Sequence, residues 1–235
     1  MAAKIAILQS SYIPWKGYFD IINKADIFVL YDDMQYTKRD WRNRNRIQTD
    51  QGLKWLSIPV IVKGRYLQKI RETKIADPDW GKKHWSIIKQ SYSESNYFKT
   101  YSKVFESIYM DSGEKFLSII NYKFIVAIND ILDIKTKIRW SSEFILNGDQ
   151  TEKLIRICKD CNADTSISGP SAKDYFDKGL AEKSNIHVEG MDYSNYQEYH
   201  QLHEPFSHQV TILDLIFNEG PNAKKYMKSF KEYYD

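Results

Sequence analysis

The sequence predicts an α/β fold with a parallel-sheet core and a helical insertion. Residues 4–8 and Ile27–Leu30 are short apolar runs typical of buried strands, and residues 15–25 between them carry apolar side chains at helical spacing. A strand, a helix and a strand in such quick succession form a βαβ unit, which makes the two strands parallel with a right-handed crossover. Further short strand patterns at 165–168 and 187–191 extend the same class of fold.

The middle of the chain changes its pattern twice. Residues 46–49 and 54–62 predict two strands around the turn at 50–52, which contains Gly52. Residues from about 80 to 132 are mostly helical in spacing, and the last helix there is apolar over a wide face, as expected of a central core helix. Residues 137–140 predict a strand.

The C-terminal third alternates between the two patterns again. Helices are predicted at 152–161, from 171 to 176, at 209–218 and at 222–233. Ser171 is a suitable N-cap for the second of these helices. The chain shows no internal repeat, low-complexity tract or clear linker, so we expect one domain over residues 1–235.

Composition and charge exclude several classes of protein. Hydrophobic residues make up 42% of the chain and charged residues 28%, an ordinary balance for a globular protein. The net charge of +3 is small for a protein that works on nucleic acid. No apolar run approaches the roughly 20 residues that span a bilayer, and the N-terminal run is short for a signal peptide. These features predict a cytoplasmic protein whose contact with a membrane would be peripheral.

The segment QYTKRDWRNRNR, residues 35–46, is the most informative part of the chain. It combines Lys and Arg with asparagines and aromatic rings, a set made up of Tyr36, Lys38, Arg39, Trp41, Arg42, Asn43, Arg44, Asn45 and Arg46. A guanidinium group is a planar fork that binds two oxygens of a phosphate or carboxylate at once. The segment therefore indicates an oriented anion, most simply a phosphate or diphosphate; the alternative is a solvated basic strand or loop.

Three features of this N-terminal region converge on one edge of the predicted sheet. Ligands of open α/β sheets bind outside the carboxyl ends of the strands. The loop that starts at Gln9 and the acidic pair Asp32 and Asp33 both follow strands, and the arginine segment comes directly after them. The predicted helix that starts near Trp15 points its N-terminal amides at the same edge, which favours an anion.

Other candidate residues lie further along the chain. His84, preceded by Lys83, is a candidate general base, with a surface residue or helix cap as the alternative. Asp214 lies inside an apolar helix pattern, so it needs a partner if buried, either an arginine or a substrate amine. The strand-to-helix turn after residue 167 offers ligand contacts at Ser168, Gly169, Lys173 and Tyr175. The cluster HQLHEPFSH matches no zinc pattern, so no metal site is predicted.

The first βαβ unit resembles the nucleotidyltransferase-like α/β superfamily. Members of that superfamily carry a Gly-His pair on the first helix to hold phosphates, whereas this chain has Gly17 and Tyr18 at the matching place. The resemblance implies a Rossmann-like sheet. The missing histidine argues against nucleotidyl transfer.

Nearly the whole chain resembles the WbqC-like family of bacterial proteins. The resemblance rests on KIAILQSSYIPWKGYFDIINKADIFVLYDDMQYTKRDWRNRNRI, followed in order by WLSIPV, KKHWSII, SGPSAKDYF and HEPFSHQVTILDLIFNEG. This sequence departs from the family at Ser10 and Ser11, where members often have proline and an aromatic residue. It also departs at residues 209–211, where a serine usually precedes Ile-Leu-Asp.

The resemblance implies a role in the biosynthesis of O-antigen and related surface polysaccharides. The activity suggested for such proteins is transfer of glycine or another acyl group to the amine of a nucleotide-linked amino sugar. In this chain the arginine segment would hold the diphosphate, and Asp32, Asp33 or His84 would take the amine proton. The sugar would rest on rings of the N-terminal region, namely Tyr12, Trp15, Tyr36 or Trp41.

The acyl donor stays open between a coenzyme A thioester and an aminoacyl-tRNA, so tRNA is not excluded as a partner. The alternatives to acyl transfer are a nucleotidyltransferase-like enzyme and a non-catalytic accessory protein that binds sugar nucleotides. The chain is also compatible with a homodimer.

Overall fold

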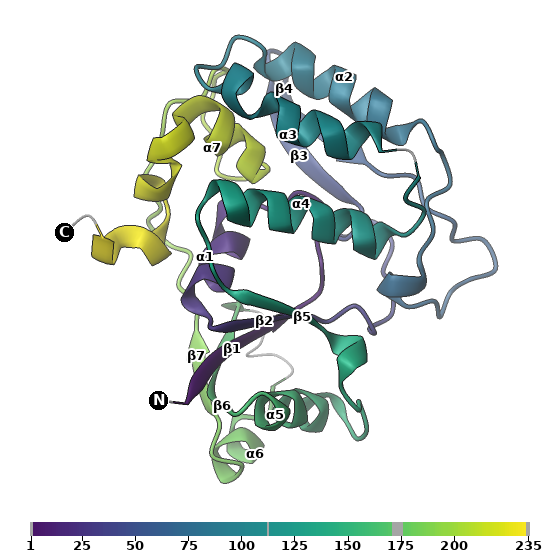
Figure 1. Ribbon diagram of the computed structural model, residues 1–235, viewed down its shortest axis with the longest axis vertical. Coiled ribbons are helices and arrows are strands. Elements are labelled where there is room, and N and C mark those ends of the chain that lie inside the picture. Colours follow the sequence, from purple (N-terminus) through teal and green to yellow (C-terminus); the bar gives the residue numbers. More distant parts are fainter. Residues whose placement is uncertain (1, 112, 171–175, 234–235) are drawn as a thin grey trace.

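The computed structural model describes residues 2–111, 113–170 and 176–233. Within these residues, one sheet consists of five parallel strands in the order β5-β2-β1-β6-β7 (Figure 1). Its strands are β1 (Ala3–Leu8), β2 (Ile27–Leu30), β5 (Lys137–Trp140), β6 (Ala163–Ser168) and β7 (His187–Gly190). The predicted α/β class with a parallel sheet is confirmed.

The N-terminal βαβ unit forms as the sequence predicts. Helix α1 (Lys16–Lys24) connects β1 to β2, and the two strands pair in register from Ile5 with Ile27 to Leu8 with Leu30. Strand β1 lies at the centre of the sheet, with β2 on one side and β6 on the other. The strand order therefore reverses between β1 and β6, and α/β sheets bind ligands at the carboxyl side of such a reversal.

Helices cover both faces of the sheet. Helices α1, α4 (Leu117–Ile131) and α7 (Ile212–Glu219) lie on one side, and α5 (Gln150–Asp160) and α6 (Lys178–Lys183) lie on the other (Figure 1). Because side chains alternate along a strand, one strand supplies both hydrophobic cores. In β1, Ala6 packs into the core under α1 and α4, and Ile5 packs into the core over α5.

The segment between β2 and β5 carries an antiparallel hairpin, three α-helices and the 3-10 helix Ile70–Glu72 among its described residues. Strands β3 (Arg44–Thr49) and β4 (Gly52–Ser57) pair around the predicted turn. Helices α2 (Trp80–Tyr92) and α3 (Phe98–Met110) follow, and α4 returns the chain to the sheet. Strand β4 ends five residues before the predicted end at residue 62, because Pro59 lacks the N–H that a ladder needs.

The C-terminal part differs from the prediction in its helix type. Helix α7 starts at Ile212 rather than at residue 209, and Thr211 caps it by accepting a hydrogen bond from the Leu213 N–H. The residues predicted as a final α-helix form two 3-10 helices, Gly220–Tyr226 and Lys228–Tyr233. Most of the helix predicted from 171 to 176 lies outside the described residues.

Candidate functional site

A cavity of about 850 Å³ opens at the carboxyl ends of β1 and β6. Its walls come from the loop after β1, the start of α1, the arginine segment, the turn after β6 and the loop before α7. The predicted site residues that line it are Gln9, Trp15, Arg42, Asn45, Arg46, Ser168 and Gly169, together with Trp41. The cavity therefore brings together the loop, the arginine segment and the β6 turn at the place where the strand order reverses.

Aromatic rings build the wall of the cavity at the start of α1. The ring of Trp15 lies against Gly17, where a Cβ atom would sit 2.4 Å from the indole. The same indole packs edge-on against Tyr193, with ring centroids 5.0 Å apart. Tyr18 also lines the cavity and donates its hydroxyl to the Gln9 carbonyl at 3.0 Å. Gly17 and Tyr18 thus shape this wall.

Arg42 supports the loop after β1. Its Nη1 atom donates to the carbonyl oxygens of Gln9 and Ser10 at 3.0 and 3.1 Å, and to Ser11 Oγ at 3.1 Å. Its Nε atom lies 3.6 Å from a carboxylate oxygen of Asp40. Part of the guanidinium's donor capacity is therefore used to hold the loop in place, although the side chain also lines the cavity.

The two arginines of β3 have different positions relative to the cavity. Arg46 lines the cavity, and its Nη2 atom donates to Gln209 Oε1 at 2.7 Å. Arg44 donates to the carbonyl of Arg39 and stacks on Trp55, with its guanidinium carbon 4.3 Å from the ring centroid. Arg46 also lies over Trp55, at 5.1 Å. Arg46 is therefore the β3 arginine placed to meet a ligand in the cavity.

The acidic pair after β2 lies behind the cavity wall rather than in it. Asp32 is buried and accepts hydrogen bonds from the Ser10 N–H at 2.8 Å and the Ser118 hydroxyl at 2.5 Å. Burial raises the pKa of the Asp32 carboxyl, although these hydrogen bonds act in the opposite direction. Asp32 thereby ties the loop after β1 to helix α4.

Asp33 has different partners from Asp32 and forms ion pairs with two cations. Its Oδ1 atom accepts from Lys69 Nζ at 2.9 Å and from Arg71 Nε at 2.8 Å, and Oδ2 accepts from the Ser141 hydroxyl at 2.9 Å. Burial acts to raise the pKa of the Asp33 carboxyl, but the hydrogen bonds from Lys69, Ser141 and Arg71 outweigh it and hold that pKa below its ordinary value. Asp33 is therefore an ion-pair partner of the segment around residue 70.

His84 and Tyr12 pack together in the core under α2. Tyr12 is fully buried, and its hydroxyl lies 2.8 Å from His84 Nδ1 and 2.7 Å from the Tyr109 hydroxyl. Burial lowers the pKa of His84 to about 4, although a hydrogen bond with the Ser57 backbone acts to raise it. Neither residue lines the cavity, and their contacts are those of a buried polar cluster.

Several other predicted residues bind other parts of the protein. Asn43 and Asn45 donate to backbone carbonyls, at 2.8 Å from Ile58 O and from Ile13 O. Lys83 is exposed and pairs with Asp77 at 2.6 Å. Asp214 is fully buried and, in place of an arginine, accepts from the hydroxyls of Tyr92 and Tyr199, both at 2.8 Å, and from the side-chain amide of Gln201 at 2.9 Å.

The remaining predicted residues lie outside the cavity lining or outside the described residues. Tyr36 is buried outside the cavity lining, whereas Lys38 and Arg39 are exposed on the adjoining loop. Lys173 and Tyr175 lie outside the described residues.

Sequence reasoning missed the part of the cavity that comes from the loop before α7. His208 and Gln209 line the cavity there, and His208 Nδ1 is buried with no hydrogen-bond partner among the described residues. Burial and, second, the charge of Lys16 lower the pKa of the His208 imidazole. His208 is thus an imidazole beside the cavity with a lowered pKa and with one ring nitrogen that has no hydrogen-bond partner among the described residues. His208 belongs to the HQLHEPFSH cluster, which was considered only as a zinc site, and its distance in sequence from the arginines gave no reason to place it with them.

Lys16, at the start of α1, is a cation buried behind this wall. Its Nζ atom donates to the Gln197 carbonyl at 3.3 Å and lies 4.7 and 5.1 Å from the ring centroids of Tyr196 and Tyr199. Burial lowers its pKa to about 8, although the carboxylates of Asp20 and Asp214 act to raise it.

The described residues contain neither a metal-binding cluster nor a membrane-spanning helix. No group of three or more His, Cys, Asp or Glu side chains there is arranged to hold a metal ion. None of the helices in the described part of the chain is both long and apolar enough to cross a membrane.

Comparison with known proteins assigns the family. The model of the WbqC-like protein family matches residues 9–226, which contain every cavity wall described above except the end of β1. The chain belongs to the WbqC-like protein family. This WbqC-like chain is also 45% identical over 225 residues to the uncharacterized protein Rv1507c of Mycobacterium tuberculosis, covering 96% of this chain and 97% of that protein. No solved structure matches the chain.

Proposed function

We propose that the cavity binds a nucleotide-linked amino sugar and that the protein transfers an acyl or glycyl group to the sugar's amine during surface-polysaccharide (O-antigen) biosynthesis. The observation that carries this proposal is one cavity with two arginines, Arg42 and Arg46, and two tryptophans, Trp15 and Trp41. Membership of the WbqC-like family supports the polysaccharide context through the family's name.

The dimensions and chemistry of the cavity suit such a ligand. Its volume of about 850 Å³ lies within the range of small-molecule sites, roughly 300–1,000 Å³. In the proposed complex Arg46 binds the diphosphate, because a guanidinium group holds phosphate oxygens in pairs. Trp15 and Trp41 supply flat faces for the sugar and the base.

His208 is the proposed base for acyl transfer. The amine nitrogen attacks the carbonyl carbon of the donor, so that a C–N bond forms and the C–S bond of a thioester, or the C–O bond of an aminoacyl ester, breaks. The amine proton passes to His208 and then to the departing sulfur or oxygen. A lowered pKa leaves the imidazole free to accept that proton. The proposed donor is a coenzyme A thioester or an aminoacyl-tRNA.

The binding step is tested by isothermal titration with dTDP- and UDP-linked amino sugars, and the matched variants are Arg46→Gln and Arg44→Gln. Both arginines project from the same face of β3 and lie over Trp55, but Arg46 alone of the two lines the cavity. Loss of charged hydrogen bonds in Arg46→Gln is expected to weaken binding by about 1.5–3 kcal/mol. Arg44→Gln is expected to bind like the unaltered protein. Equal losses in both variants would place the ligand on the outer face of the hairpin instead.

The chemical step is tested by product formation, followed by mass spectrometry, with acetyl coenzyme A or glycyl-tRNA as donor. His208→Asn is expected to bind the sugar nucleotide yet form product at least about 100-fold more slowly, a typical contribution of a general base. Full activity in this variant would remove the role given to His208.

A second candidate function is a non-catalytic sugar-nucleotide-binding accessory protein. It is favoured by the positions of Asp32, Asp33 and His84, none of which lines the cavity. Tight binding of an amino-sugar nucleotide without product from any donor would select it. Turnover of ATP or another nucleoside triphosphate would select a nucleotidyltransferase-like enzyme instead.

A further inference from the structure

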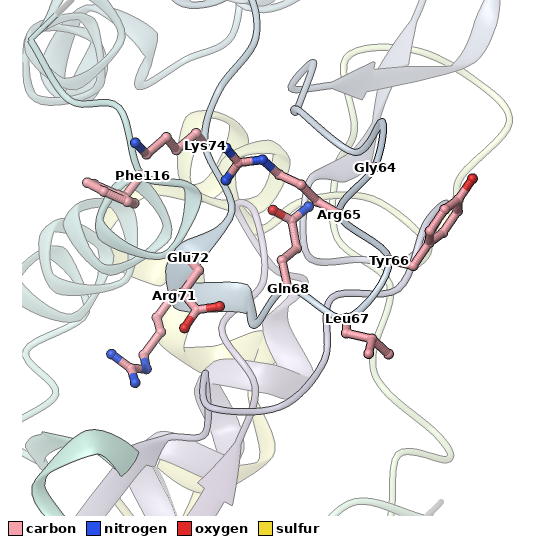
Figure 2. Close-up of a pocket in the computed structure, with 9 residues that line it drawn as sticks. All are labelled: Gly64, Arg65, Tyr66, Leu67, Gln68, Arg71, Glu72, Lys74 and Phe116. Carbon is pink, nitrogen blue, oxygen red and sulfur yellow. The ribbon is translucent and has the colours of Figure 1, made fainter.

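An open groove of about 930 Å³ lies on the segment between the hairpin and α2 (Figure 2). We call residues 61–74 the basic loop. Its residues supply most of the groove, with Phe116 on the opposite side. None of the groove-lining residues lines the cavity, so the groove is a separate surface.

The tip of the basic loop exposes large apolar side chains. Tyr66 is 72% exposed and Leu67 is 83% exposed, the highest values among the exposed large hydrophobic residues described. Both project outward from the turn in Figure 2. Ile61, at the start of the loop, is also exposed. A globular protein rarely places two such side chains together in solvent unless they meet a partner.

A glycine turn and several hydrogen bonds fix the backbone conformation that exposes this tip. Gly64 adopts a φ of +71°, which allows the turn, and the Arg65 N–H donates to the Val62 carbonyl at 3.1 Å. Gln68 is buried and donates its side-chain amide to the Ile61 carbonyl at 2.8 Å, so that it closes the loop across its base. The tip is therefore held outward by hydrogen bonds.

The loop carries a concentrated positive charge. Residues 63–74 contain five basic side chains and one acidic side chain, a net of +4, whereas the whole chain has a net charge of +3. Lys63, Arg65 and Lys74 have no acidic partner within ion-pair distance among the described residues. In Figure 2, Arg65 and Lys74 lie on the Phe116 side of the groove, whereas Tyr66 and Leu67 lie at the opposite end.

We propose that the basic loop docks the protein on a membrane surface that contains anionic lipids. Tyr66 and Leu67 enter the boundary between headgroups and acyl chains, and Lys63, Arg65 and Lys74 bind headgroup phosphates. An exposed apolar tip on a loop that also carries cations is the combination that holds a protein at an anionic bilayer surface, with tyrosine at the interface. RNA would use the cations and the Tyr66 ring, but it offers nothing to an exposed leucine.

The test is co-sedimentation of the full-length protein with lipid vesicles at physiological ionic strength. Vesicles of phosphatidylcholine mixed with phosphatidylglycerol are compared with vesicles of phosphatidylcholine alone. We expect binding to the mixed vesicles and a loss of about 100-fold on the neutral ones, because each of the three basic residues near the surface contributes roughly fivefold.

Two double variants separate the apolar and the charged contributions. Tyr66→Ser/Leu67→Ser is expected to weaken partitioning to the mixed vesicles by more than about tenfold through loss of inserted apolar surface. Arg65→Gln/Lys74→Gln is expected to weaken it by about 25-fold. The charge-matched control, Lys99→Gln/Lys103→Gln on α3, removes two exposed lysines elsewhere and is expected to bind almost normally.

Three results would overturn the proposal: equal binding to both kinds of vesicle, unchanged partitioning of the two loop variants, or binding to a short duplex RNA without binding to vesicles. The experiment contains no sugar nucleotide, so its outcome is independent of the function proposed for the cavity.

Discussion

The sheet-edge cavity and the groove on the basic loop use positive charge in different ways. In the cavity, Arg42 and Arg46 already donate to protein oxygens, which fixes the direction of each guanidinium before any ligand arrives. In the groove, Arg65 and Lys74 lie on an open surface without acidic partners among the described residues. Preorganised cations select one geometry of anion, whereas cations on an open surface respond to charge density. The cavity therefore suits a small oriented ligand, and the groove suits an extended one.

Two consecutive carboxylates support these two regions. Asp32 accepts from the Ser10 N–H and holds the loop that lines the cavity. Asp33 accepts from Lys69 and Arg71 and holds the base of the basic loop. A single turn of chain after β2 thus fixes both surfaces. Because each carboxylate supports a different region, a substitution can disturb one region while leaving the other in place.

The largest expected effect comes from Arg42→Met, which should disrupt the cavity alone. The substitution leaves the carbonyls of Gln9 and Ser10 and the carboxylate of Asp40 without their cationic partner. We expect the free energy of unfolding to fall by about 3 kcal/mol and sugar-nucleotide binding to be lost. Urea unfolding and calorimetry measure the two effects. Vesicle binding by the folded variant should remain; a variant of normal stability and affinity would show that Arg42 is not the support of the loop.

The next effect is a pH dependence of opposite sign for the two carboxylates. The lowered pKa of Asp33 means that its contribution is present above its unfolded pKa of roughly 3.9 and is lost as the pH falls through its folded pKa. Asp33→Asn should therefore destabilise the protein by about 1–2 kcal/mol at pH 7 and flatten the acid limb of the stability curve.

Asp32 has a raised pKa, so stability falls as the pH rises from roughly 3.9 through its folded pKa, and Asp32→Asn should remove that fall. Urea unfolding at a series of pH values compares the variants. Identical profiles for the two would contradict the division of roles.

The smallest expected effect comes from Trp55→Leu, which tests how much the Trp55 ring contributes to holding the two arginines of β3. Arg44 and Arg46 lie 4.3 and 5.1 Å from the Trp55 ring centroid. Loss of this stacking at exposed sites is worth about 0.5–1 kcal/mol, so we expect a two- to fivefold weaker affinity for the sugar nucleotide. Isothermal titration measures it. An unchanged affinity would mean that Gln209 and Trp41 are sufficient to orient Arg46.

Local patterns predicted the fold more completely than the site. The strands predicted at 27–30 and 137–140 have the observed bounds. A short apolar run and the residues that end it are adjacent in the sequence, so local spacing is enough to locate such a strand. The helix type after Gly220 was not predictable, since 3-10 and α-helices share similar spacing of apolar residues over one or two turns.

Only the part of the site that lies in or directly after the N-terminal βαβ unit could be predicted from the sequence. The loop after β1 and the arginine segment were expected at one edge, and the cavity contains both. The division between Arg46 and Arg44 depends on Gln209 and Trp55, and the burial of His84 depends on Tyr12 and Tyr109. Such long-range contacts leave no trace in local spacing, so sequence patterns could not separate these residues.

One wall of the cavity owes its position to a missing side chain. The indole of Trp15 rests where a Cβ atom of residue 17 would lie, so it can stay back against the helix only because that residue is glycine. Any larger residue there would have to displace the ring from this position. The shape of this wall is thus set at Gly17, a residue that is not itself among those that line the cavity.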